Sequence, residues 1–168
     1  MAKVIVVLGN DVSTDVIYPG RYMATVLPSE TPQFAFADDA DFNARLKAKE
    51  FPPGSVIVAG ENFGCGSSRE QAVSALKGHD LTIVAGSFAR IFLQNSINLG
   101  LRLAIAPGIA ATEGDEIDLQ QECVVNATSG KKFPLVRLPR ARQAIIDAGG
   151  LIPYTRKRVM DTLRDTKS

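Results

Sequence analysis

Short apolar runs that alternate with helix-like stretches dominate the first two thirds of the chain. Three runs rich in β-branched residues predict strands at positions 4–8, 55–60 and 81–86, and the apolar run at 101–106 predicts another. Helical segments are predicted after the second and third runs, over about 68–77 and about 87–98. Gly78 and Gly100 stand where the C-terminal glycines of these helices belong. Because helices separate consecutive strands, the pattern predicts a parallel sheet with right-handed crossovers.

The segments before and between these units are less regular. Residues 13–28 contain two prolines and a glycine without a clear period, which predicts an ordered loop. Residues 41–50 predict a short helix that ends before Pro52, Pro53 and Gly54.

The pattern changes after Gly108. Three short strands joined by polar turns, typical of antiparallel hairpins, are predicted at 116–119, 123–127 and 132–138. A last helix is predicted over about 139–148, and a basic tail at 156–168 is predicted to be helical or frayed. The whole chain, residues 1–168, is therefore interpreted as one α/β domain: parallel strands with helices, plus a β-rich part.

Composition and charge argue against several kinds of function. The 168 residues suit one globular domain, and 19 basic against 18 acidic residues give a net charge of +1, which does not support nucleic-acid binding. The chain has one histidine, His79, and two cysteines, Cys65 and Cys123, too few for a four-thiolate cluster or a structural zinc site of its own. Without a signal peptide or an apolar run near ~18 residues, we expect a soluble cytoplasmic protein with no metal and no membrane segment.

The segment 61–72, which reads ENFGCGSSREQA, has the residues of an anion site. Glycines allow close backbone approach, and a following helix N-terminus directs N–H groups at a ligand. Arg69 adds a planar fork for carboxylate or phosphate oxygens. The alternative is that Ser67 or Ser68 only caps the helix, with Glu70 or Gln71 reaching back.

Several sharper motifs do not fit this segment. Arg69 follows Gly64-Cys65-Gly66-Ser67-Ser68 where a dinucleotide fingerprint needs its third glycine, and no Walker sequence or hydrolase elbow is present. A Cys65–His79 nucleophile needs the fold to bring the two side chains together. We expect Cys65 to be a small packed residue and His79 a surface or capping histidine.

Together with residues 11–15 (DVSTD) and 86–92 (GSFARIF), the stretch 62–70 resembles the aconitase superfamily. The similarity is to separate small subunits of 3-isopropylmalate dehydratase and their homoaconitase-like relatives, and it covers nearly the whole chain. This resemblance implies a swivelling β/β/α domain of the aconitase C-terminal type, which closes over a large subunit that carries a 4Fe–4S cluster. It also implies a small di- or tricarboxylic hydroxy acid as substrate and hydro-lyase chemistry.

The resemblance also assigns roles to individual residues. Ser67 matches the general base, and Asp15 matches the acidic catalytic residue of the Thr-Asp phrase. Ser68 and Arg69 match residues that bind substrate carboxylate, on loop backbone supplied by Gly64, Cys65 and Gly66. We also expect Arg90 to serve the subunit interface.

The resemblance further implies that the loop with Arg21, Tyr22 and Met23 faces the variable end of the substrate. Arg21 is predicted either to contact a carboxylate or to be solvated, and Tyr22 and Met23 to line an apolar wall. Residues 19–23 (PGRYM) depart from the Pro-Ala-Arg-Tyr-Leu form common in isopropylmalate enzymes. Gln71-Ala72-Val73 replaces the frequent His-Ala-Pro and resembles homoaconitase-type sequences. A homoaconitase-type or other substituted-malate substrate therefore stays open, as does a stand-alone anion- or phosphate-binding module.

Overall fold

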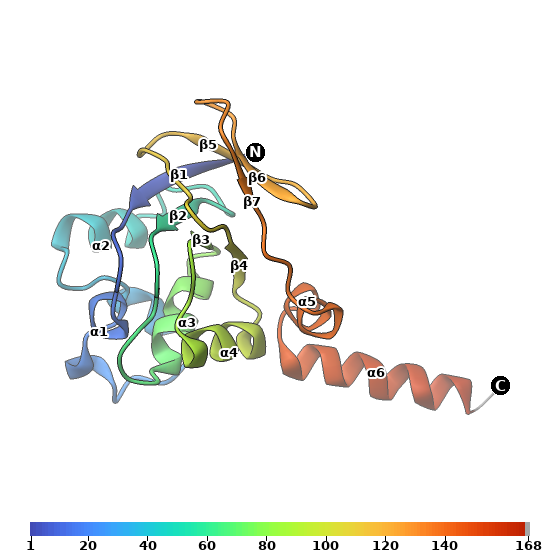
Figure 1. The fold of residues 1–168 in the computed structure, drawn as a ribbon. Helices are drawn as coiled ribbons and strands as arrows, with labels where there is room; N and C mark the ends of the chain where they lie inside the picture. Colours follow the sequence, from blue (N-terminus) through green and yellow to red (C-terminus); the bar gives the residue numbers. More distant parts are fainter. Residues whose placement is uncertain (167–168) are drawn as a thin grey trace.

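A mixed sheet forms the centre of residues 1–166, the part of the chain that the computed structural model describes. Its strand order is β4-β3-β2-β1-β5-β6-β7 (Figure 1). Four strands are mutually parallel: β1 (Ala2–Val7), β2 (Val56–Ala59), β3 (Thr82–Ala85) and β4 (Arg102–Ile105). The other three pair antiparallel: β5 (Glu116–Leu119), β6 (Cys123–Asn126) and β7 (Lys132–Pro134). Strand β5 joins the two parts by pairing antiparallel with β1.

Four helices lie in the connections between the parallel strands and pack on one side of them: α1 (Thr14–Ile17), α2 (Ala40–Lys47), α3 (Glu70–Gly78) and α4 (Arg90–Leu99). Two more, α5 (Arg140–Asp147) and α6 (Leu151–Asp165), follow β7. Two 3₁₀ turns, Gly20–Tyr22 and Thr31–Phe34, lie in the connection between β1 and α2. Figure 1 shows α3 and α4 together below the strands, with α5 beside α4 and α6 projecting away from the body. Among the helices described, none has the length and apolar character of a membrane span.

Alternate residues of the parallel strands enter two different cores. Ile57, Ala59 and Ile83 belong to the large cluster formed with the helices. Val56, Val58 and Val84 belong to a second cluster that includes Ile117 and Val124 of the antiparallel strands. Both faces of β2 and β3 are therefore buried, which is why these strands read as continuous apolar runs.

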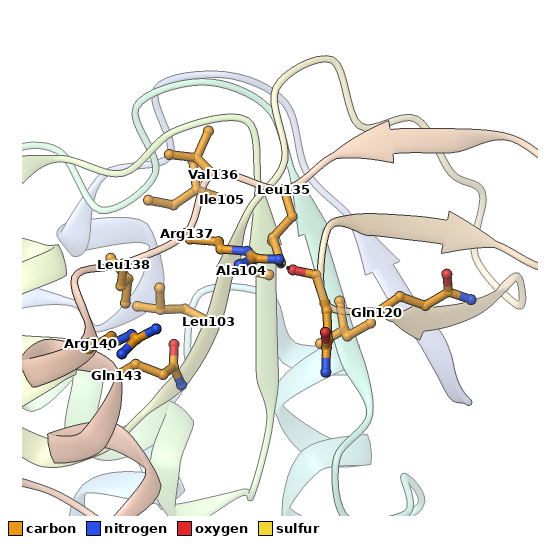
Figure 2. A pocket seen from close by; sticks show the side chains of 12 residues that line it. Leu103, Ala104, Ile105, Gln120, Leu135, Val136, Arg137, Leu138, Arg140 and Gln143 are labelled. Carbon is orange, nitrogen blue, oxygen red and sulfur yellow. Dashed lines mark hydrogen bonds between the residues drawn. The ribbon is translucent and has the colours of Figure 1, made fainter.

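The chain that follows β7 covers the outer edge of β4. Val136 N donates to Ile105 O at 2.8 Å, and the two residues form an isolated antiparallel bridge. A cavity of about 340 Å³ lies at this seam, lined mainly by aliphatic side chains together with Arg137 and Arg140 (Figure 2). The bridge satisfies part of an edge that would otherwise be open for pairing.

The predicted α/β architecture is confirmed, with its parallel strands, helices and antiparallel part. The loop predicted at 13–28 is wrong in part, because it contains α1 and a 3₁₀ turn. Ser13 caps α1 by accepting a hydrogen bond from Val16 N at 3.3 Å. A four-residue helix is too short to show a period in the sequence.

Three further boundaries differ from the prediction. Strand β7 ends at Pro134 rather than 138. Gly78 is the last residue of α3, but the positive φ typical of a C-terminal glycine occurs at Asp80, where φ is 53°. Glycine at position 78 instead permits a close contact, because a Cβ there would lie 2.2 Å from Pro32 Cγ. The tail is helical from Leu151 onward, and its last two residues, 167–168, lie outside the described part.

Candidate active site

The loops that follow β1 and β2 lie side by side at one edge of the sheet. Parallel strands end in the same direction, so their carboxyl ends bring these loops together. Gly64 N donates to Val12 O at 2.7 Å, and Thr14 N donates to Cys65 O at 2.8 Å. We call residues 62–69 the serine loop. Its backbone is thus hydrogen-bonded to the loop that carries Asp15.

Aromatic rings form the floor of the serine loop. Phe63 is fully buried and meets the ring of Phe92 edge-on at 5.2 Å between centroids. Gly64 has a φ of +82°, and a Cβ there would lie 2.2 Å from Phe92 Cγ. Gly66 also has a positive φ, +93°. Both glycines therefore have the left-handed backbone that glycine favours, and Gly64 also permits a close approach that a side chain would prevent.

Ser67 and Ser68 are exposed, and neither caps α3. The helix begins at Glu70, and the residue in the cap position is Arg69, whose N–H donates to Ser67 O at 2.8 Å. The capping alternative is therefore wrong, and so is the capping box. Gln71 instead donates from Nε2 to Met23 O at 3.1 Å.

Thr14, which is buried, positions Ser67. Its hydroxyl donates to Ser67 O at 2.9 Å and lies 3.5 Å from Ser67 Oγ. Within residues 1–166 the hydroxyl of Ser68 makes no hydrogen bond, and that of Ser67 makes only this long one. Both hydroxyls are thus available to a ligand. The role of Thr14 was not predicted; its only signal was a threonine beside Asp15.

Arg69 links the two loops. Its Nη1 donates to the carboxylate of Asp15 and, at 3.2 Å, to Tyr18 O. The arginine side chain is 15% exposed and the aspartate 66%, so the cation is the buried member of the pair. The Nε of Arg69 is buried and has no partner among the described residues. A buried donor without a partner lowers the free energy of unfolding by about 1–3 kcal/mol. A bound ligand that accepts a hydrogen bond from Nε would explain why this atom is kept.

The Arg69 guanidinium lowers the pKa of Asp15 below its ordinary value of 3.8, and a hydrogen bond from Gly20 N, at 2.9 Å, adds to the effect. Asp15 is therefore a carboxylate at neutral pH. Its geometry fits a group that holds Arg69 in place rather than one that exchanges protons.

Arg21, Tyr22 and Met23 lie on the neighbouring 3₁₀ turn. Arg21 bonds to Asp38 at 2.5 Å and lies over the Tyr22 ring at 4.6 Å, and Tyr22 stacks on Phe34. Met23 is about half exposed. The bond from Gln71 to Met23 O ties this turn to α3, directly after the serine loop.

Cys65 and His79 lie at opposite ends of α3. Cys65 is a half-buried free thiol on the serine loop. His79 is half-buried, with Nε2 2.8 Å from Pro32 O, and burial lowers its pKa below 6.5. In the described part of the chain, no three Cys, His, Asp or Glu side chains come together in a group that could hold a metal ion.

The close approach of Gly64 to Phe92 predicts a costly substitution. We expect Gly64→Ala to lose about 2–5 kcal/mol of unfolding free energy, from left-handed strain and overpacking. Gly108→Ala is the matched control, because Gly108 has a φ of +74° but nothing within 4 Å of its missing Cβ. It should lose about 1–2 kcal/mol, from strain alone. Urea unfolding followed by circular dichroism measures both, and equal losses would contradict the packing argument.

The Asp15–Arg69 pair predicts a pH-dependent contribution to stability. A carboxyl group whose pKa is lowered by folding stabilises the protein above its unfolded pKa, and the contribution is lost as pH falls through the folded pKa. Asp15→Asn should therefore melt below the parent protein at neutral pH, and the difference should shrink at pH values below 3.8. Thermal melts across this range measure the effect. A difference independent of pH would show that the pair does not titrate as described.

Comparison with known proteins confirms the resemblance. The family model described as the aconitase C-terminal domain matches residues 18–106. The isopropylmalate/citramalate isomerase small subunit of Methanocaldococcus jannaschii is 42% identical over 160 residues, which cover 92% of each chain. The 3-isopropylmalate dehydratase small subunit of Moorella thermoacetica is 44% identical over 157 residues, covering 90% of this chain and 92% of that one.

A solved structure agrees with the sequence relatives. The crystal structure of 3-isopropylmalate dehydratase from Methanocaldococcus jannaschii superposes with a TM-score of 0.83 at 40% identity, covering 99% of this chain and 98% of that chain. The chain therefore belongs to the aconitase C-terminal domain family, among the small subunits of 3-isopropylmalate dehydratase.

Proposed function

We propose that this chain is the small subunit of a heteromeric hydro-lyase of leucine biosynthesis. The enzyme interconverts 2- and 3-isopropylmalate by dehydration and rehydration. The observation that carries the proposal is the exposed pair Ser67 and Ser68 beside the partly unpaired guanidinium of Arg69. Relatives more than 40% identical over nine tenths of the chain are named as small subunits of this kind of enzyme.

Ser67 is proposed as the base that removes the proton from the carbon next to a substrate carboxylate. A serine hydroxyl is a weak acid, so its alkoxide needs fixed positive charge nearby. Arg69, two positions after Ser67, supplies that charge. Thr14 holds the backbone of Ser67 through a hydrogen bond to its carbonyl oxygen. Because the helix cap is not made by Ser67, its hydroxyl can turn toward substrate.

Ser68 and Arg69 are proposed to bind a carboxylate of the substrate. Nη1 of Arg69 is engaged by Asp15 and Tyr18, whereas Nη2 makes no hydrogen bond within the described residues. Nη2 is therefore available to donate to a carboxylate oxygen of the substrate. Asp15 is proposed to keep the Arg69 guanidinium in this orientation and to stay ionised.

Ser67 and Ser68 of the serine loop are exposed at the surface, so a partner subunit is proposed to cover them. The whole chain is proposed to move as one unit relative to that subunit. The described residues do not fit an iron–sulfur cluster, and the proposal therefore assigns the 4Fe–4S cluster to the large subunit. There it would bind the hydroxyl that leaves. Two unpaired cysteines are typical of a reducing compartment, which supports a cytoplasmic location.

A related substituted malate is the second candidate substrate. Gln71, one of the departures from common isopropylmalate sequences, bonds to Met23 O on the turn proposed to face the variable end of the substrate. Arg21, held by Asp38, and Tyr22 would line the same end. One relative is named as acting on both isopropylmalate and citramalate.

Reconstitution tests the function. We expect the purified chain mixed with its large subunit to interconvert the two isopropylmalates, and neither protein alone to do so. Citramalate and homoaconitate, assayed in parallel, rank the substrates. Absence of turnover with all of these acids, or tight binding of a phosphate ester by the isolated chain, would contradict the proposal and favour a stand-alone anion-binding module.

Ser67→Ala tests the base in the same assembled enzyme. We expect kcat to fall about 10²–10⁴-fold, the usual worth of general-base help, with KM little changed. Ser129→Ala, at an exposed serine in the turn after β6, is the control and should keep full turnover. Near-normal kcat for Ser67→Ala would remove Ser67 from the role.

A further inference from the structure

A groove lies between α4 and α5, directly behind the serine loop. Its volume is about 630 Å³, and its walls include Gly64 and Gly66 of the serine loop, Arg90 and Ile91 of α4, and Arg142 of α5. Figure 1 shows the two helices next to each other at the end of the molecule where α6 begins. The groove therefore adjoins the proposed active site through Gly64 and Gly66, but Ser67, Arg69 and Asp15 do not line it.

Two arginines in the groove lack partners. Arg90 and Arg142 are exposed, and their side chains make no ion pair or hydrogen bond within residues 1–166. In contrast, five other arginines of the body are ion-paired: Arg21, Arg45, Arg69, Arg102 and Arg137. The groove has no acidic residue in its lining. Its positive charge is thus uncompensated by the chain itself.

Apolar surface accompanies the charge. Ile91 is 52% exposed although it stands at the start of a helix whose other face enters the core. Leu93 also lines the groove and is partly exposed. An apolar patch beside unpaired arginines is the composition of an interface, where arginine is enriched and lysine is depleted.

We propose that this groove docks an acidic segment of the large subunit, whose carboxylates pair with Arg90 and Arg142 and whose apolar side chain covers Ile91. The inference rests on the proposed function, because that function requires the partner to cover the serine loop. Because Gly64 and Gly66 line the groove, a partner surface that covers the serine loop would also contact the groove. Charge complementarity sets the chemistry of the occupant: carboxylates on a protein segment.

Arg142→Glu, alone and with Arg90→Glu, tests the docking surface. Arg140→Glu is the matched control, since Arg140 lies on the same helix, is exposed and unpaired within the described residues, but lines the separate seam cavity (Figure 2). The dissociation constant for the separately purified large subunit is measured by calorimetry, and kcat at saturating large subunit by assay. Arg142→Gln removes the charge without reversing it, and melting curves check that each variant is folded.

We expect Arg142→Glu to weaken assembly about tenfold or more at low salt, with a smaller effect for Arg142→Gln and a shallower salt dependence in both. Arg140→Glu should stay within about twofold, and kcat of the saturated complexes should be unchanged. Equal weakening by Arg140→Glu and Arg142→Glu, or no weakening by either, would overturn the docking proposal. So would a fall in kcat at unchanged affinity, which would place Arg142 on the substrate.

The two proposals fail in different ways. Assembly of the parent subunits without turnover of any of the acids contradicts the enzymatic function, and the groove is still tested by binding. Normal turnover with unchanged affinity of Arg142→Glu contradicts the groove alone.

Discussion

The ion pair between Arg69 and Asp15 is the interaction on which the arrangement of the site depends. It joins residues that are 54 positions apart and belong to loops after adjacent parallel strands. The cation is mostly buried and the anion mostly exposed, so the aspartate compensates a guanidinium that has already lost most of its water. Removing a partner of such a charge is costly, which makes Asp15 a structural requirement for Arg69. The serine loop, Thr14 and the 3₁₀ turn at Gly20 are all arranged around this contact.

Packing below the loop makes the arrangement rigid. The rings of Phe63 and Phe92 fill the space under Gly64, and the strands that carry the loops are buried on both faces. The serine hydroxyls are therefore presented on a fixed backbone, which the proposed role of Ser67 requires. Their exposure is consistent with the proposal that surface of a partner subunit covers them.

Much of the fold could be predicted from the sequence because its signals are local. The β-branched runs predicted β2 and β3 closely, since a strand buried on both faces has no polar alternation to obscure it. Strand β4 was also located, although Arg102 leaves it only partly buried. The seam between β4 and Val136 could not be predicted, because the pairing partners are distant in the chain. Helix α6 was recognised only in part, because the predicted tail began at 156, whereas the helix begins at Leu151, directly after Gly150. Pro153 stands in its first turn, where proline is tolerated.

The same contrast applies to the site. The serine loop was located from its glycines, serines and arginine, but a helix cap at Ser67 or Ser68 was an equally local interpretation and proved wrong. The start of α3 is displaced because Arg69 takes the cap position and turns its side chain to Asp15. Only the fold reveals that partner. Thr14 was missed for the same reason, as its contact with Ser67 spans 53 positions.

The contact between Gly64 and Phe92 has a consequence for how the site can change. A side chain at Gly64 would force the aromatic core to repack at the same time, so this position does not tolerate a single change easily. In the turn at Arg21–Met23, only Tyr22 packs against the core, through its ring on Phe34, whereas Arg21 and Met23 are exposed. Under the proposed function, the exposed positions of this turn can therefore be exchanged one at a time, which would change the substrate accepted, while the packed serine loop and its reaction are kept.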